Sequence, residues 1–136
     1  MLATRNRLRT PTDFSTTVRS GVRNGRRNLV LYTAALAADE PSRIGFIVSK
    51  SVGNAVVRNL VKRRLREAGA LSLQKYPSGF AIVVRALPAS AAAGWDDLLG
   101  DYDAALQTTM KRLGSRLPQA ASTVSYETTQ EGTPRA

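Results

Sequence analysis

The stretch SKSVGNAVVRNLVKRRLREA, residues 49–68, determines how the rest of the chain is interpreted. Six of its twenty residues are Lys or Arg, and Glu67 is its only acid. Its apolar residues recur at helical spacing, and Gly53-Asn54 supplies a tight entry with a capping side chain. The stretch therefore predicts one amphipathic helix with an unusually high positive charge.

At 100° per residue, the predicted helix has an apolar side and a cationic side. The apolar side contains Val56, Val57, Leu60, Val61, Leu65 and Ala68. The polar side contains Arg58, Asn59, Lys62, Arg63 and Arg66. Arg64 falls within the apolar arc, where we expect its stem to pack while the guanidinium reaches solvent. Neighbouring donors without acids repel one another, so the pattern favours a partner over simple solvation.

The spacing on the polar side indicates a phosphate-bearing partner. Arg58, Lys62 and Arg66 follow one another at i, i+4 and i+8, which presents charge along one line suited to a phosphate backbone. Asn59 can hydrogen-bond a base edge or a ribose 2′-hydroxyl. A solubilising charge and a basic membrane-surface helix are the alternatives.

The charge of the whole chain supports a nucleic-acid partner. The 136 residues carry a net charge of +10, and their 43% hydrophobic content suits one domain with one core. Residues 1–66 contain 14 Lys/Arg against 3 Asp/Glu, whereas residues 67–136 contain 6 against 7. All of the excess charge lies in the first half, which favours binding to a polyanion by counterion release.

The residue types that are missing also narrow the function. Without cysteine, neither disulfides nor thiolate metal sites are available, and a cytoplasmic protein is expected. Without histidine, the commonest general base and zinc ligand are missing. The basic N-terminus lacks a following apolar segment, and the longest apolar stretch, residues 29–38, is too short to span a bilayer, so no membrane association is expected.

The remaining elements follow from caps, turns and periodicity. Thr10-Pro11 predicts a helix from Pro11 to Arg19 that stops at Gly21, and Asn24-Gly25 predicts a tight turn. Strands are predicted at residues 28–36, 43–50 and 80–87. A last helix is predicted to open at Asp96-Asp97 and to end before Gly114. Its apolar side contains Leu98, Tyr102, Leu106, Met110 and Leu113. Residues 1–117 are expected to form the domain, and residues 118–136 a disordered tail.

Several of these segments together resemble the bacterial ribonuclease P protein component. KSVGNAVVRNLVKRRLREA (residues 50–68) is similar to the Arg-Asn-Arg signature region of that family. NRLRTPTDF (6–14), LVLYT (29–33) and VVRALPAS (83–90) resemble its opening helix, its central strand and the strand and turn after the basic helix. The resemblance runs from Arg5 to about Leu117. Leu60 departs from the signature, which often has a second arginine there, and Arg64 is the candidate substitute.

The resemblance implies a fold and a function. The fold is an α/β (α+β) two-layer sandwich with about four strands and three helices. Its β-α-β crossover is left-handed, as in the second domain of ribosomal protein S5, against the usual right-handed rule. The function is that of the protein subunit of ribonuclease P, an endoribonuclease that removes the 5′ leader of precursor tRNA. In this family the catalytic RNA performs the hydrolysis, with Mg²⁺ held by the RNA and the substrate.

The resemblance also implies which residues bind RNA, and it implies no catalytic residue, metal ligand or small-molecule substrate for the protein. The expected partners are the catalytic RNA and precursor tRNA. The residues expected to contact RNA are Lys50, Asn54, Arg58, Asn59, Lys62, Arg63 and Arg66. The residues expected to line a cleft for the single-stranded leader are Phe14, Val18 and Tyr32. Val18 stands where the family often has an aromatic residue, so weaker stacking is expected there.

Two other functions stay open on the residues alone. A small basic ribosomal or RNA-chaperone-like protein would share the charge, the size and the basic helix. A metal-dependent nuclease acting alone would need converging carboxylates. The candidates are Asp96, Asp97, Asp101 and Asp103. They crowd the start of the last predicted helix, where acids are favourable for the helix dipole in any case.

Overall fold

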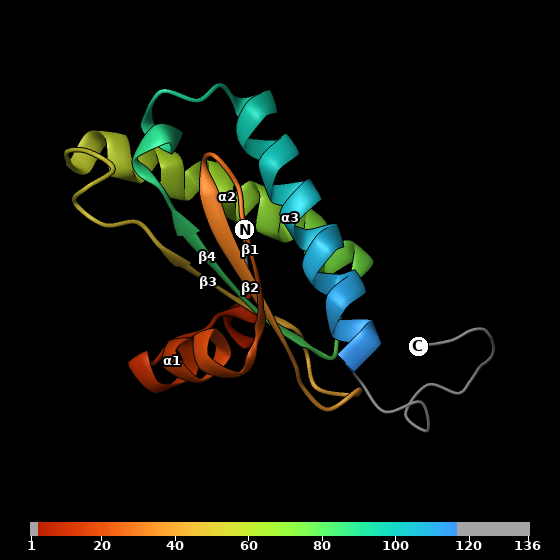
Figure 1. Cartoon of the computed structure of the whole chain (residues 1–136). Helices are drawn as coiled ribbons and strands as arrows, with labels where there is room; N and C mark the ends of the chain where they lie inside the picture. The colour runs from red at the N-terminus through yellow and green to blue at the C-terminus, as the bar shows by residue number, and fades with distance from the viewer. Residues whose placement is uncertain (1–2, 117–136) are drawn as a thin grey trace.

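A mixed four-stranded sheet organises the chain, and a computed structural model describes residues 3–116 (Figure 1). The elements in chain order are η1 (Thr4–Asn6), α1 (Pro11–Ser20), β1 (Val22–Gly25), β2 (Leu29–Ala35), β3 (Arg43–Ile47), α2 (Ala55–Lys75), β4 (Phe80–Ala86), η2 (Pro88–Ala91) and α3 (Trp95–Arg116). The three predicted helices and three predicted strands are all present.

The strands lie in the order β1-β2-β4-β3. β2 pairs antiparallel with β1 and β4, whereas β3 pairs parallel with β4. A parallel pair needs a crossover connection, and α2 provides it between β3 and β4. The predicted β-α-β unit around the basic helix is therefore confirmed, and its left-handed sense stays a prediction.

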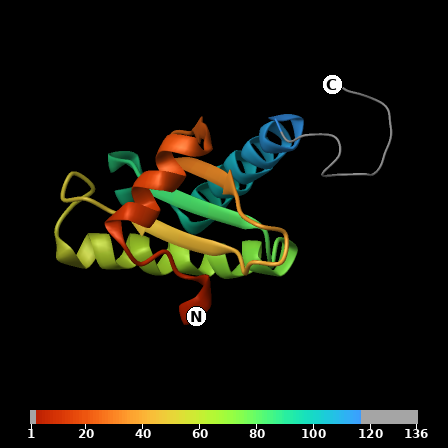
Figure 2. The same ribbon diagram turned by 90° about the horizontal axis from the view of Figure 1, so that it is seen from below.

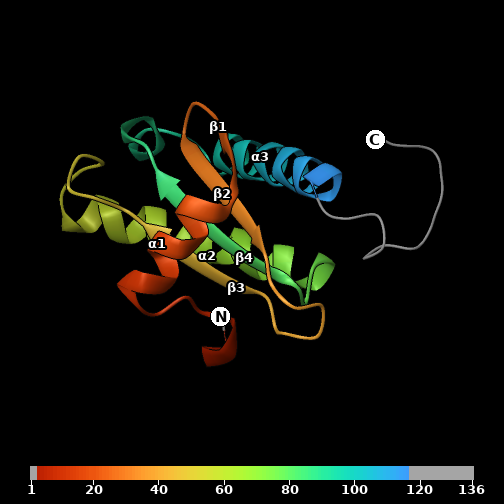
Figure 3. The ribbon, with the colours of Figure 1, turned by 60° about the horizontal axis from the view of Figure 1, so that its bottom comes forward.

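Helices lie against both faces of the sheet. α2 and α3 lie behind it in the view of Figure 3, and α1 crosses the front; Figure 2 shows the same separation from below. Side chains alternate along each strand. Leu31 and Val84 therefore join the core under α2 and α3, whereas Tyr32 and Val83 join the smaller cluster under α1.

The caps of the first two helices form as the sequence predicts. The Thr10 side chain accepts a hydrogen bond from the Asp13 backbone N at 3.1 Å, and Pro11 opens α1. The Asn54 Oδ1 accepts from the Val57 backbone N at 3.0 Å and opens α2. Both caps satisfy backbone donors that the first helical turn leaves unpaired.

The apolar side of α2 differs from the prediction in one respect. Val61, Leu65 and Ala68 are buried as expected, but Val56 is 77% exposed. α2 continues to Lys75, and its buried residues extend to Ser72. The buried stripe of the full helix is centred on Val61, Leu65 and Ala68, and Val56 lies outside it.

The turn predicted at Asn24-Gly25 is wrong by a few residues. Asn24 and Gly25 end strand β1, which the sequence did not reveal, and they pair with Leu31 and Val30 of β2. The chain reverses in the next residues, where the Arg26 N donates to the Leu29 O at 2.7 Å. A tertiary contact fixes this position, because the Asp101 carboxylate accepts two hydrogen bonds from Asn28.

The end of the last helix also differs from the prediction. α3 runs to Arg116 and passes through Gly114, which is exposed and has no neighbour that a Cβ would meet. The predicted boundary at residue 117 and the predicted disordered tail lie outside the described residues. Within residues 3–116, no helix has both the length and the apolar character needed to cross a membrane.

Candidate nucleic-acid interface

The predicted RNA-contacting residues of α2 form two rows. Arg58, Lys62 and Arg66 form the inner row; Arg58 and Lys62 are half-buried, and Arg66 is exposed where it lines a cavity with the edge strand β3. Asn59 and Arg63 form the outer row and are exposed. The helix therefore offers a cationic surface that begins at the sheet edge and continues to the outermost side of α2.

Arg58 is the most enclosed residue of the inner row. Its Nε is buried and has no hydrogen-bond partner among residues 3–116. An unmatched buried donor is unfavourable, so packing of the stem must hold this side chain at the helix edge. Packing therefore restricts the Arg58 side chain before any partner binds.

The segment before α2 places the other two predicted contacts. Lys50 is exposed in the loop that joins β3 to α2, where the hydroxyls of Ser49 and Ser51 lie 2.7 Å apart. Asn54 is exposed as well, but its Oδ1 is used as the helix cap. Any contact between Asn54 and RNA would therefore fall to its Nδ2 group.

Arg64 was predicted to pack its stem in the apolar arc while its guanidinium reaches solvent. It is half-buried, and its Nη1 donates to the Ala93 carbonyl at 2.9 Å. This contact joins α2 to the segment between η2 and α3. One end of the guanidinium is thus already engaged, which limits its use in place of an arginine at position 60.

A cavity of about 430 Å³ connects the basic helix to the first helix. Its lining comes from the N-terminal segment, α1, β3 and α2: Arg7, Leu8, Phe14, Ile44, Gly45, Phe46 and Arg66. The predicted RNA-contacting residues and the predicted leader-cleft residues therefore meet at this cavity. Arg66 belongs to the RNA-contacting residues, and Phe14 belongs to the leader-cleft residues.

Gly45 explains how the Phe14 ring reaches this position. A Cβ on residue 45 would overlap the Phe14 ring and would lie 3.0 Å from the Leu8 Cβ, so only glycine lets the ring lie directly on the strand. Gly45 and Arg7 were not among the predicted site residues. An isolated glycine within a strand pattern indicates that another group approaches the backbone closely, and this signal could have identified Gly45.

The predicted leader-cleft residues come together on the α1 face of the sheet. Phe14 and Val18 of α1 are half-buried and pack in one cluster with Tyr32 of β2. Tyr32 is only 6% exposed, and the Arg85 guanidinium lies 6.0 Å from the centre of its ring. Arg85 was missed, although alternation along β4 places it on the same face as Val83. Arg85 partly covers the ring that was expected to stack on a leader base.

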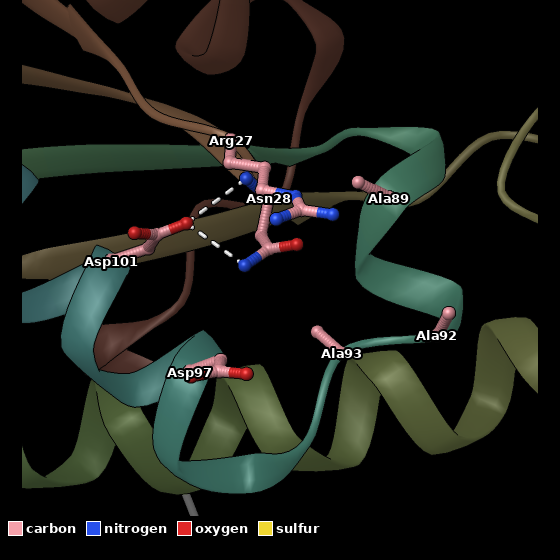
Figure 4. Close-up of a pocket in the computed structure, with 7 residues that line it drawn as sticks. All are labelled: Arg27, Asn28, Ala89, Ala92, Ala93, Asp97 and Asp101. Atoms are coloured by element: carbon pink, nitrogen blue, oxygen red, sulfur yellow. Dashed lines mark hydrogen bonds between the residues drawn. The ribbon is translucent and has the colours of Figure 1, made fainter.

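Among the acidic residues of α3, Asp101 has a structural role. Asp97 and Asp101 line a cavity of about 270 Å³ with Arg27 and Asn28 (Figure 4). The Asp101 Oδ2 accepts from the Asn28 backbone N at 3.0 Å and from its Nδ2 at 2.9 Å. Asp101 thereby anchors the turn between β1 and β2. Within the described part of the chain, no three His, Cys, Asp or Glu side chains are grouped to hold a metal ion.

The buried hydroxyl of Tyr102 is also structural. It lies 3.0 Å from the Ser72 Oγ, between α3 and α2. Burial raises the pKa of Tyr102 to about 12, with the Ser72 hydrogen bond acting in the opposite direction. The hydroxyl therefore stays protonated at neutral pH and contributes to packing of the two helices.

The fold and the cationic surface together define a small α+β RNA-binding protein. The sequence profile of the Ribonuclease P family matches residues 2–110. The chain belongs to this family. Its function is that of the family's protein component, a subunit of a tRNA-processing ribonucleoprotein with an RNA partner.

Relatives and solved structures agree with this assignment. A ribonuclease P protein component of Arthrobacter sp. strain FB24 is 87% identical over 136 residues, the full length of both chains. One from Kocuria rhizophila is 56% identical over 112 residues, which cover 82% of this chain and 98% of that protein.

Two solved structures share the fold. The RNase P protein of Staphylococcus aureus has a TM-score of 0.69 at 26% identity, covering 76% of this chain and 94% of that one. The Thermotoga maritima protein has a TM-score of 0.65 at 25% identity, covering 79% and 97%. The predicted α+β sandwich with a four-stranded sheet and three helices is thus confirmed.

Proposed function

We propose that the two surfaces divide the binding work of ribonuclease P. The cationic rows of α2, with Lys50 and Asn54, bind the catalytic RNA. The cleft between α1 and the sheet holds the 5′ leader of precursor tRNA, which the assembled enzyme removes by endonucleolytic hydrolysis. The observation that carries this proposal is the shared cavity, because Arg66 and Phe14 both line it. A leader strand leaving the cleft would meet the cationic helix without crossing an apolar gap.

The leader would be held by ring faces and nearby cations. Unpaired bases stack on aromatic side chains irrespective of sequence. Phe14 is half-buried on Gly45, so part of its ring is accessible to a base. Tyr32 lies deeper beneath Arg85, whose guanidinium could contact a base or a phosphate of the leader. Val18 adds an apolar contact in place of a third ring.

In this proposal the chemistry belongs to the RNA partner. Mg²⁺ held by the RNA and the substrate would supply the activated water and stabilise the leaving oxygen. The residues of this chain fit a binding role: Asp101 is engaged by Asn28, and the chain has no histidine to act as a general base. The protein's charge would offset repulsion between the phosphates of the RNA and the substrate. The cytoplasm is the expected place of action.

Reconstitution of precursor-tRNA cleavage tests this division. The protein alone should cleave nothing at any Mg²⁺ concentration. The cognate RNA alone should be weak at low Mg²⁺ and should recover when protein is added, because protein cations replace part of the screening by Mg²⁺. The benefit should shrink at high Mg²⁺.

A variant separates the remaining alternatives. Asp97→Asn removes an exposed carboxylate of α3 and should leave the reconstituted activity unchanged. Cleavage by protein without RNA, abolished by Asp97→Asn, would instead establish a protein nuclease. Equal RNA activity with and without protein at low Mg²⁺, together with cofractionation with ribosomes, would favour a ribosomal role.

A further inference from the structure

The outermost side of α2 contains an apolar residue that the fold does not use. Within residues 3–116, the exposed large hydrophobic residues are Val56, at 77%, and Leu71, at 50%. Val56 lies in the first turn of α2, and Asn59 and Arg63 follow three and seven residues later on the same side. The most exposed large apolar side chain of residues 3–116 therefore lies among the predicted RNA contacts, with Asn54 before it and Arg58 and Asn59 after it.

Leu60 extends this apolar surface by one helical turn. Residues at i and i+4 are neighbours on a helix, so the side chains of Val56 and Leu60 lie close together. Leu60 is half-buried, and the Arg64 guanidinium on its far side is fixed to the Ala93 carbonyl. Val56 and Leu60 thus form a short apolar strip beside the outer cationic row, at the position where the resemblance leads one to expect an arginine.

We propose that the RNA partner covers this apolar strip. Sugar and base surfaces of the RNA pack on Val56 and Leu60 while a neighbouring phosphate contacts Arg63 of the outer row. The inference rests on the proposed binding of RNA by α2, and it adds an apolar contact to a surface so far described only by charge. RNA offers suitable surfaces, because its shallow minor groove and unstacked bases expose ribose and ring faces.

The charges around the strip favour RNA over a second copy of this chain. Asn59 and Arg63 of the outer row flank the strip, the cations of the inner row lie beyond them, and Glu67 is the only acid on the helix. Two such surfaces facing each other would bring like charges together. A polyanion instead gains from the cations and from burial of the strip in one contact.

An apolar contact and a phosphate contact respond differently to salt. Neutralising a phosphate releases counterions and steepens the salt dependence of binding. Burial of apolar surface releases none, so its contribution is nearly constant across moderate salt concentrations. The strip should therefore account for binding that persists when the salt concentration is raised.

Affinity for the cognate RNA, measured over a salt series with the full-length protein, tests the proposal. Val56→Thr keeps the shape of the side chain and replaces one methyl by a hydroxyl. It should weaken binding about fivefold to tenfold at every salt concentration and leave the slope unchanged. Arg63→Gln should instead reduce the slope by about 0.7 to 0.9.

Two further variants control for the position of the substitution and for charge at position 60. Leu71→Thr introduces the same residue type at the other exposed large apolar position, near the far end of α2, and should bind like the unmodified protein. Leu60→Arg should steepen the slope by about 0.7 to 0.9, with a loss of affinity at high salt. Melting curves should show that the variants are folded.

The outcomes distinguish failure of the inference from failure of the proposed function. If Val56→Thr binds within twofold of the unmodified protein while Arg63→Gln changes the slope, RNA binds α2 but leaves the strip uncovered, and the inference is overturned. It is also overturned if Leu71→Thr weakens binding equally, or if Val56→Thr breaks a dimer without weakening RNA binding. If the unmodified protein shows no salt-dependent binding, the proposed function fails.

Discussion

The two faces of the sheet differ in how completely they are covered. The face under α2 and α3 buries a large cluster that includes Leu31, Leu65 and Tyr102, all at or near zero exposure. The face under α1 buries far less, and Phe14 and Val18 are half-buried there. A short helix across a sheet leaves part of that face open, whereas two long helices side by side close the other.

The polar groups show the same contrast. On the face under α2 and α3, the closed face, buried hydroxyls pair within the core: Thr33 with Thr109 at 2.9 Å, and Tyr102 with Ser72 at 3.0 Å. On the face under α1, the open face, the exposed Arg85 lies over the Tyr32 ring. Satisfied buried polar pairs help to specify one packed structure, whereas exposed cations beside rings are available to a ligand. Stability and recognition are thus separated by the sheet.

The largest expected effect concerns stability of the closed face. Leu65 is fully buried between α2 and the sheet, so Leu65→Ala removes its packing and leaves a cavity. The free energy of unfolding should fall by about 2 to 5 kcal/mol in urea denaturation.

Leu71→Ala provides the matched control, because it changes the same residue type on the same helix at a half-exposed position. It should lower the free energy of unfolding by less than about 1 kcal/mol. Equal losses at the two positions would contradict the burial pattern of α2. Neither variant should change the salt slope of RNA binding while it remains folded.

The second effect concerns RNA binding by the inner row of the same helix. Replacing Arg58, Lys62 and Arg66 together by Gln keeps stems of useful length and removes three cations. The salt slope should fall by about 2, which corresponds to roughly hundredfold weaker RNA binding at 0.1 M salt. Stability should fall only modestly, because Gln keeps part of the packed Arg58 stem and Arg66 is exposed, and melting curves should show that the variant is folded.

A matched triple variant controls for net charge. Arg19, Lys75 and Lys111 are exposed cations outside the rows of α2, and their replacement by Gln removes the same total charge. The slope should then change much less. If both triples reduce the slope equally, the RNA responds to overall charge and α2 is not its docking surface.

Local signals in the sequence predicted most of the closed face. The capping residues Thr10 and Asn54 marked helix starts that the structure confirms within a residue. The apolar run at residues 80–87 became the central strand β4, which is buried on both faces. These predictions succeeded because caps and periodicity act over a few neighbouring residues.

The features that the sequence did not reveal depend on distant contacts. Asn24 and Gly25 have the composition of a turn, but Asp101 holds Asn28 from 73 residues away and the turn forms later. Val56 belongs to the apolar arc of a short helix, yet it lies outside the stripe that the full α2 buries. The contact of Phe14 with Gly45 and the position of Arg85 over Tyr32 likewise require the assembled sheet.

The smallest expected effect tests the open face at its most buried aromatic residue. Precursor and mature tRNA differ in the leader, so a cleft that binds the leader changes the preference between them. Tyr32→Leu removes the ring but keeps apolar volume. Because Tyr32 is 6% exposed beneath Arg85, its loss should lower precursor preference only about fivefold, the low end of about 1 to 3 kcal/mol for base stacking.

The matched control for this last prediction is a tyrosine on the other side of the sheet. Tyr76 is half-buried against the core under α2 and α3, so Tyr76→Leu should leave precursor preference unchanged. Assembly with the RNA should be similar for both variants, because neither residue belongs to the cationic rows. Competition between precursor and mature tRNA for the reconstituted enzyme gives the preference, and melting curves give the folded state. If a well-folded Tyr32→Leu protein keeps its full preference, Tyr32 serves only as core packing and the open face does not bind the leader at this residue.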